Sequence, residues 1–194
     1  MPEQIRIGVV GVRNIGKNHL RQCVGLEGVA AAAIVDTDPE RLREVGEEFG
    51  VAARFANMDA MLAGAELDAV VLAVPNHLHA PLTVRALEAG KHVLVEKPMS
   101  RTVQEADQMI RAREAGGKVL MVGMNQRFNP VTAGLKRQIA EGVIGEIYYG
   151  RTRWDLFRPF EGLWGRGDWF LSQENSGGGP VIDLGVHRLD LALH

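Results

Sequence analysis

Two titratable residues near the end of the 194-residue sequence have the spacing of an acid–base pair. Asp183 and His187 stand four residues apart in 180–194, a segment with helical spacing that begins with a proline, the residue favoured at the first helical position. Residues four apart share one face of a helix. A histidine exchanges a proton near neutral pH, and an adjacent carboxylate favours its imidazolium form. The pair is therefore a candidate for proton transfer, or else a structural ion pair at a helix start.

The same helical face continues with Asp190 and His194, three and seven residues beyond His187. Two aspartates and two histidines on one stripe could in principle hold a divalent metal ion. No second cluster of such residues completes a site elsewhere in the sequence. We therefore expect no metal.

Lys97 is a candidate for the cation of the same chemistry. It follows an apolar segment, 92–95, that has the character of a buried strand. Ligands of open α/β sheets bind at the carboxyl ends of such strands, and Pro98 restricts the backbone of Lys97 to extended geometry. Oxidation of an alcohol needs a base for the hydroxyl proton and a positive group near the oxygen. Without a ligand, Lys97 would be a solvated surface residue.

The elements that must position these residues alternate regularly up to residue 122. Short apolar segments, typical of strands covered on both faces, lie at 5–10, 29–35, 69–74, 92–95 and 119–122. Between them, helical spacing extends over 15–26, 39–49, 58–62, 80–89 and 103–115. Repeated β-α-β units predict the α/β class: a doubly wound parallel sheet of Rossmann type with right-handed crossovers.

The first strand runs directly into a glycine turn, I-G-V-V-G-V-R-N-I-G at 7–16. Gly11 permits the tight turn, and Gly16 permits close packing of helix on sheet. The amino end of the helix offers free N–H groups to a pyrophosphate. We expect Gly11, Arg13, Asn14 and Ile15 to line this site, although Arg13 replaces the middle glycine of the usual G-x-G-x-x-G pattern.

A carboxylate in the expected place indicates which coenzyme the turn would bind. Asp36 ends the second strand, 20 residues after Gly16, the spacing at which a carboxylate reaches the adenosine ribose hydroxyls. It would repel a 2′-phosphate, which favours NAD over NADP. Arg13 and Arg41 keep NADP possible, because either guanidinium could accept that phosphate. The alternative is a tight turn with no ligand, in which Asp36 only caps the turn.

After residue 122 the regular alternation ends. We expect a helix at 130–141, a strand at 146–156, an irregular aromatic and glycine-rich stretch at 157–179, and a helix at 180–194. These elements are too few to close a core. The domains predicted are therefore 1–123, which binds the dinucleotide, and 124–194, the start of an incomplete α/β domain.

Composition narrows the class of partner. The net charge of −2, with 46% apolar and 24% charged residues, gives no electrostatic reason to expect a nucleic acid or an anionic membrane. The amino terminus lacks the pattern of a signal peptide, no apolar run has the length of a membrane span, and Cys23 has no partner for a disulfide. We expect a soluble, cytoplasmic protein.

Three further segments resemble the glucose–fructose oxidoreductase / inositol dehydrogenase (Gfo/Idh/MocA) family. They are V-P-N-H-L-H at 74–79, G-K-H-V-L-V-E-K-P at 90–98, and G-G-G at 177–179 followed by D-L-G-V-H at 183–187. With the glycine turn, the matches occur in order over residues 5–194. Arg13 departs from the family pattern.

The resemblance implies NAD-dependent hydride transfer on a sugar or polyol substrate by a homo-oligomer that works without a metal. By this analogy Lys97 contacts the reacting hydroxyl and the cofactor, His187 is the acid/base, and Asp183 is its partner. Further cofactor contacts are expected from Asp36, Arg41, Val74, Pro75, Asn76, His79, Glu96 and Asn125, and further substrate contacts from Arg127 and Trp164. His79 could instead cap its helix and satisfy the local backbone.

Two other functions remain open at this point. An NAD-dependent glycoside hydrolase, known in the same superfamily, would oxidise its substrate transiently and return NAD unchanged. A non-catalytic dinucleotide-binding module would bind NAD without any turnover.

Overall fold

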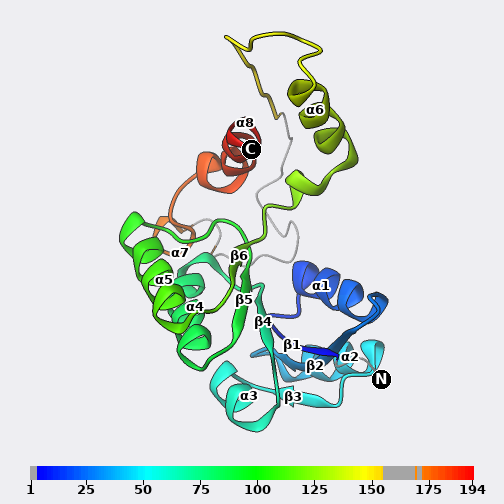
Figure 1. Ribbon diagram of the computed structural model, residues 1–194. Helices are drawn as coiled ribbons and strands as arrows, with labels where there is room; N and C mark the ends of the chain where they lie inside the picture. Colours follow the sequence, from blue (N-terminus) through cyan, green and yellow to red (C-terminus); the bar gives the residue numbers. More distant parts are fainter. Residues whose placement is uncertain (1–3, 155–168, 170–171) are drawn as a thin grey trace.

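Six parallel strands form one sheet in the order β3-β2-β1-β4-β5-β6. The computed structural model describes residues 4–154, 169 and 172–194, and Figure 1 shows the sheet with helices on both faces. The strands are β1 (Ile5–Val10), β2 (Val29–Val35), β3 (Ala53–Phe55), β4 (Ala69–Leu72), β5 (His92–Val95) and β6 (Leu120–Val122). The order reverses direction at β1 and β4, which places a topological switch point between them.

Alternate residues of the strands supply two separate cores. Val9, Ile34 and Val71 are buried on one face, under α1 (Asn14–Gly25) and α2 (Pro39–Phe49). Val10 and Leu72 are buried on the other face, which is covered by α3 (Met58–Gly64), α4 (His79–Glu88) and α5 (Val103–Gly116). Side chains of a strand point alternately to opposite faces, so near-continuous apolar runs fit a sheet covered on both. The predicted doubly wound α/β fold is confirmed.

Local signals explain where the helices begin and end. Asp38 accepts hydrogen bonds from the backbone N–H groups of residues 40 and 41 at the start of α2, and Thr102 caps α5 through Glu105 N–H. Gly50 and Gly117 end these two helices in left-handed conformation.

One strand was not predicted from the sequence, and several element boundaries differ from those predicted. β3 has only three residues and pairs at the sheet edge with β2, so it has too few residues to show a period. β4 ends at Leu72, two residues earlier than expected, because Ala73 and Val74 already belong to the connection that leads to η1 (Asn76–Leu78).

Beyond β6, short helical elements predominate in the described part of the chain. They are η2 (Asn125–Phe128), α6 (Pro130–Ala140), α7 (Gln173–Ser176), the π-helical turn η5 (Val181–Gly185) and α8 (Val186–Leu193). The expected helices at 130–141 and 180–194 are therefore present, the second with a π-helical start.

The strand expected at 146–156 is wrong over 146–154, where the chain has no regular secondary structure. A strand needs a neighbour for its backbone hydrogen bonds, and no described strand pairs with this stretch. The side chain of Tyr148 is accordingly 97% exposed. Residues 155 and 156 lie outside the described residues.

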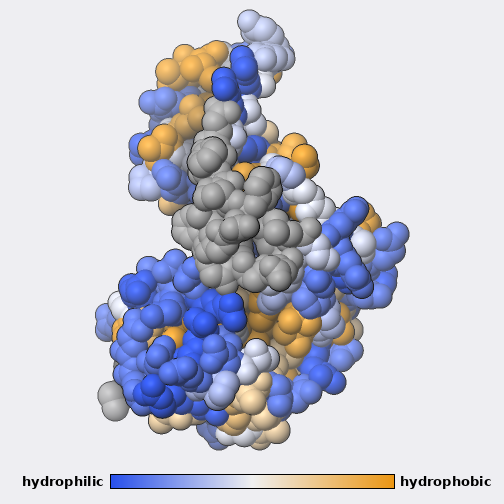
Figure 2. Space-filling model, turned by 180° about the vertical axis from the view of Figure 1, so that it is seen from behind, coloured by the Kyte–Doolittle hydropathy of each residue, from blue (hydrophilic) through white to orange (hydrophobic). Residues whose placement is uncertain are grey.

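Exposed apolar side chains gather on the part of the molecule that follows β6. Figure 2 shows apolar patches on its upper part, and the contributing residues include Val131, Leu135, Val143 and Ile147. None of the described helices combines the length and the apolar character required to cross a bilayer.

The contrast between buried and exposed positions of α1 gives a test of the core. Leu20 is fully buried between helix and sheet, whereas Val24, on the same helix, is 57% exposed. We expect Leu20→Ala to lower the free energy of unfolding by about 2–5 kcal/mol, because it leaves a cavity. Val24→Ala should change it by less than about 0.5 kcal/mol. Urea denaturation measures both, and equal losses would contradict this packing.

Candidate active site

The glycine turn between β1 and α1 has no room for side chains at two positions. Gly11 has φ +82°, and a Cβ there would lie 2.3 Å from the carbonyl oxygen of Ala73. A Cβ at Gly16 would lie 1.8 Å from the carbonyl oxygen of Gly11. The roles predicted for both glycines, a tight turn and close packing, are confirmed. Arg13 occupies the N-cap position of α1 without a side-chain capping bond, so the amino end of the helix is not closed by its own cap.

Asp36 lies beside this turn at the end of β2. Its Oδ2 accepts a hydrogen bond from Val12 N–H (3.0 Å), its Oδ1 accepts one from Asp38 N–H (3.1 Å), and the residue is 8% exposed. Asp36 therefore has the turn-capping contacts that the sequence left open. A carboxylate offers about four acceptor positions, so these two bonds leave capacity for ribose hydroxyls.

Arg41 lies in the first turn of α2, three residues after its N-cap Asp38. Its Nη2 is 3.4 Å from Asp38 Oδ2, while its Nε is buried without a hydrogen-bond partner among the described residues. The guanidinium is thus held at the start of α2, beside the place expected for the adenosine ribose.

A buried polar contact between the two parts of the chain joins Lys97 and Asp183. Lys97 Nζ donates to the carboxylate Oδ1 and to the backbone carbonyl of Asp183, both at 2.9 Å. The two side chains are 14% and 9% exposed. Lys97 is therefore not a solvated surface lysine. The peptide bond between Lys97 and Pro98 is cis.

His187 is buried on the same side of the π-helical turn and α8 as Asp183. Its ring centroid lies 5.8 Å from that of Trp154, and its Nδ1 has no hydrogen-bond partner among the described residues. Burial, and next the Lys97 ammonium, hold the pKa of His187 below its ordinary value of 6.5. The neutral ring is thus favoured, and a neutral ring can accept a proton.

His79 and Asn76 hold protein segments together after β4. The ring nitrogens of His79 lie 2.7 Å from Pro98 O and 2.9 Å from Val74 O, and the residue is 1% exposed. Burial lowers its pKa. His79 thus satisfies local backbone groups, the alternative that the sequence left open. Asn76 Nδ2 donates to Ser176 O at 2.7 Å.

The sequence analysis missed His19, which faces Glu96. His19 Nε2 lies 2.8 Å from Glu96 Oε1, and Glu96 Oε2 accepts from Lys97 N–H at 3.2 Å. A Cβ at Gly123 would lie 3.0 Å from the same carboxylate. Glu96 therefore joins α1, the loop of Lys97 and the end of β6. The helical spacing could have identified His19, because it follows Gly16 by about one turn of α1.

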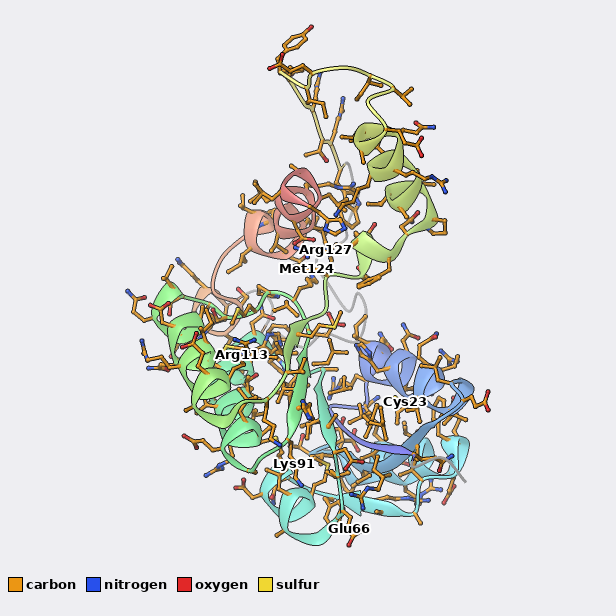
Figure 3. All side chains as sticks on the ribbon, in the orientation of Figure 1. Cys23, Glu66, Lys91, Arg113, Met124 and Arg127 are labelled. Atoms are coloured by element: carbon orange, nitrogen blue, oxygen red, sulfur yellow. The ribbon has the colours of Figure 1, made fainter. Side chains whose placement is uncertain are left out.

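Other predicted contacts lie at the junction after β6, where Figure 3 labels Met124 and Arg127. Arg127 Nε and Nη2 donate to the Asp190 carboxylate at 2.7 and 2.5 Å, so this guanidinium fastens η2 to α8. Asn125 begins η2. Trp164 lies outside the described residues.

The stripe of aspartates and histidines does not converge on a common point. Asp190 pairs with Arg127, and His194 lies near Lys136 Nζ at 3.3 Å. Over residues 4–154, 169 and 172–194 there is no group of three or more histidine, cysteine, aspartate or glutamate side chains placed to hold a metal ion.

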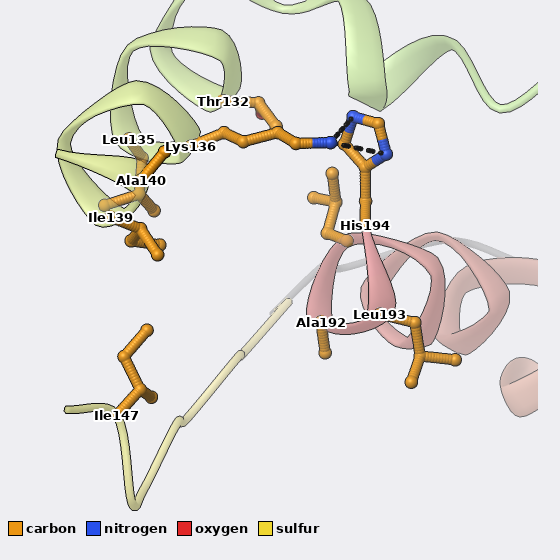
Figure 4. Close-up of a pocket in the computed structure, with 10 residues that line it drawn as sticks. Thr132, Leu135, Lys136, Ile139, Ala140, Ile147, Ala192, Leu193 and His194 are labelled. Atoms are coloured by element: carbon orange, nitrogen blue, oxygen red, sulfur yellow. Dashed lines mark hydrogen bonds between the residues drawn. The ribbon is translucent and has the colours of Figure 1, made fainter. Parts of the chain in front are cut away.

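A cavity of about 330 Å³ lies away from these groups. Figure 4 shows it between α6, Ile147 and the C-terminal helix, with Lys136 and His194 in contact at its edge. Its lining is mainly apolar, and none of the residues predicted to be catalytic contributes to it. It is an apolar groove separate from the cluster of Lys97, Asp183 and His187.

The chain matches two family models. The model described as "Oxidoreductase family, NAD-binding Rossmann fold" covers residues 5–124, and the model of the GFO/IDH/MocA C-terminal domain covers 132–194. D-glucoside 3-dehydrogenase of Escherichia coli is 34% identical over 98% of this chain and 53% of its own length. Myo-inositol 2-dehydrogenase of Thermotoga maritima is 29% identical over 97% and 54%.

The solved structures that are similar to this chain include dehydrogenases as well. Myo-inositol 2-dehydrogenase from Lactobacillus plantarum is similar with a TM-score of 0.85 and 26% identity, over 98% of this chain and 56% of that one. The WlbA dehydrogenase from Bordetella pertussis, in complex with NADH and UDP-GlcNAcA, has a TM-score of 0.71 and 33% identity, over 75% and 45%. The chain spans about half the length of the relatives it matches.

The surroundings of His187 lead to a prediction about its titration. Lys97 lowers the pKa of His187, whereas Glu96 and Asp183 raise it. In Lys97→Met the two carboxylates remain and the ammonium is gone, so we expect the pKa of His187 to rise. Lys91, whose Nζ donates to Leu67 O, provides the control Lys91→Met, which should leave it unchanged. Histidine ring signals followed by NMR across pH measure both, and an unchanged or lower value in Lys97→Met would contradict the proximity.

Proposed function

The chain belongs to the GFO/IDH/MocA family of NAD-binding oxidoreductases, and on this premise we propose that it transfers a hydride between NAD and a secondary hydroxyl of a sugar or cyclic polyol. The observation that carries the proposal is the buried contact of Lys97 with Asp183, beside a histidine that is held neutral. The relatives named above are dehydrogenases, so the dehydrogenase is retained over the glycoside hydrolase.

The residues of the glycine turn fit a dinucleotide. Gly11 and Gly16 leave backbone rather than side chains at the amino end of α1, the surface that a pyrophosphate requires. Asp36 adds a carboxylate with unused acceptor positions. When bound, NAD supplies the acceptor for the hydride that leaves the carbon of the substrate. We place Asn125, Glu96 and the loop at 74–76 along the path from this turn to Lys97.

Residues of the protein must accept the proton of the hydroxyl group and stabilise the negative charge that develops on its oxygen. His187, neutral because of its burial and of Lys97, accepts the proton of the hydroxyl group. The Lys97 ammonium donates a hydrogen bond to the same oxygen as negative charge develops there. Asp183 holds Lys97 through two acceptors, so it orients the ammonium. In the reverse direction, His187 returns the proton to the carbonyl oxygen as the hydride reaches the carbon.

The domain division and the assembly follow from the same proposal. Residues 1–123 are the dinucleotide-binding domain, and residues 124–194 belong to the domain that contributes substrate contacts, with Arg127 and Trp164 among them. The exposed apolar residues after β6 support a surface that is covered in a homo-oligomer. A cytoplasmic location agrees with a small polar substrate and a soluble coenzyme.

Coenzyme preference is testable by thermal unfolding. We expect NAD to raise the melting temperature more than NADP at equal concentration, because Asp36 repels a 2′-phosphate. A ligand at one hundred times its Kd stabilises a protein by about 2.7 kcal/mol, which differential scanning fluorimetry detects. Asp38→Asn, which weakens the ion pair with Arg41, should reduce the difference by releasing that guanidinium. Equal shifts for the two coenzymes would overturn the argument from Asp36.

Turnover is testable with NAD and a panel of myo-inositol, scyllo-inositol and methyl D-glucoside. We expect NADH formation with at least one of them, and a loss of about a hundredfold or more in Lys97→Met. Lys91→Met is the matched control, since Figure 3 places Lys91 at the opposite end of the sheet. NAD binding without NADH formation would instead indicate the non-catalytic module.

A further inference from the structure

Residues 172–179, which precede Asp183 and His187, lie against the loops of the α/β domain. α7 packs against η1, and Ser176, 3% exposed, gives its carbonyl oxygen to Asn76 Nδ2. The Ser176 hydroxyl donates to Ser172 O at 2.8 Å and lies 3.0 Å from Gly178 O. The turn is therefore internally bonded and attached to the domain that contains Lys97.

Arg101 makes a second attachment of this turn. Its Nη1 donates to Glu174 O at 2.5 Å. The Glu105 carboxylate accepts from Nε, from Nη2 and from the backbone N–H of Arg101. Glu105, which lies four residues from Arg101 on the same segment, thus holds the guanidinium in an orientation in which Nη1 faces the carbonyl oxygen of Glu174. Such a fork geometry is available to arginine and not to lysine.

The fit between the two segments is also steric. Gly177 has φ +84°, and a Cβ there would lie 2.8 Å from Arg101 Cβ and 3.0 Å from Arg101 Cα. The chain at 177 therefore rests directly on the residue that bonds to Glu174. Arg101 therefore bonds to the turn through its guanidinium, and the atoms around its Cα and Cβ leave no room for a side chain at position 177.

Segments 97–101 and 174–183 are joined by two contacts and run in opposite directions. Lys97, at the start of the first segment, bonds to Asp183 at the end of the second, and Arg101, at the end of the first, bonds to Glu174 at the start of the second. Since both contacts lie on the same pair of segments, the second contact limits how the first can move. A displacement of about 1 Å at a reacting group can cost about a hundredfold in rate.

We propose that Arg101 is a positioning residue that sets the place of Asp183 and His187 relative to Lys97 by fastening residues 174–177. This inference rests on the proposed function, and nothing in the glycine turn or at Asp36 depends on Arg101. Its loss therefore lowers turnover while coenzyme binding persists.

The experiment compares Arg101→Ala, Arg101→Lys and the control Arg85→Ala. Arg85 also forms an arginine–carboxylate pair, with Asp59 at 2.8 Å, but on an exposed surface. Measured quantities are kcat and KM with NAD and the most active compound of myo-inositol, scyllo-inositol and methyl D-glucoside, the Kd for NAD, and amide hydrogen exchange of residues 173–179. We expect Arg101→Ala to lower kcat by about ten- to a hundredfold, to keep the Kd for NAD within about twofold, and to speed exchange at 173–179. Arg101→Lys should have a kcat and an exchange rate between those of Arg101→Ala and the unchanged chain. Arg85→Ala should match the unchanged chain in all of these quantities.

Two results would overturn the inference: unchanged exchange at 173–179 in Arg101→Ala, or faster exchange with unchanged kcat. A rise in the Kd for NAD together with a fall in kcat would also count against it, because that pattern indicates general loss of structure. If the unchanged chain binds NAD but turns nothing over, the proposed function fails. In that case the exchange of 173–179 alone decides whether Arg101 fastens this turn.

Discussion

The buried ion pair of Lys97 with Asp183 is the constraint on which the second half of the chain depends. A charge removed from water is costly unless it is paired and hydrogen-bonded, and the ammonium here gains both the carboxylate and a backbone carbonyl of one residue. Removal of either partner would take this ion pair away from the other buried charge. The helical segment at 181–193 must therefore return to the carboxyl edge of the sheet, although it is far from Lys97 in sequence. Asn76 with Ser176 and Arg127 with Asp190 are further contacts of the second half of the chain.

The sequence predicted the fold where local pattern and tertiary burial agree. Val29–Val35 is apolar throughout, and Ile5–Val10 is apolar except for Arg6, because both faces of the sheet are covered. Helix ends such as Gly50 have a local backbone cause. The three residues of β3 were missed because a strand that short shows no period. The alternation at 146–154 predicted a strand that is absent, since alternation describes one face of a sheet and does not provide a partner.

The structure brings only some of the predicted site residues together, for a related reason. Motif and spacing identified Lys97, Asp183 and His187 individually, and the structure brings all three into one buried cluster. Spacing predicted that Asp183 pairs with His187, whereas the ion pair described here is with Lys97, 86 residues away along the chain. Contacts of that range, including His19 with Glu96, depend on the crossing of elements rather than on local sequence. His79 is the opposite case. Its motif predicted a cofactor contact, but both of its ring nitrogens lie beside backbone oxygens.

Asp36 couples two properties that could otherwise change independently. The carboxylate proposed to select NAD also holds Val12 N–H of the phosphate-binding turn and Asp38 N–H at the start of α2. A mutation that removed its charge to admit a phosphorylated coenzyme would therefore loosen the turn in the same step. A change at the side chain of Arg41 would leave both hydrogen bonds of Asp36 in place. A change toward NADP is thus constrained by hydrogen bonds of Asp36 that are separate from its proposed role in coenzyme recognition.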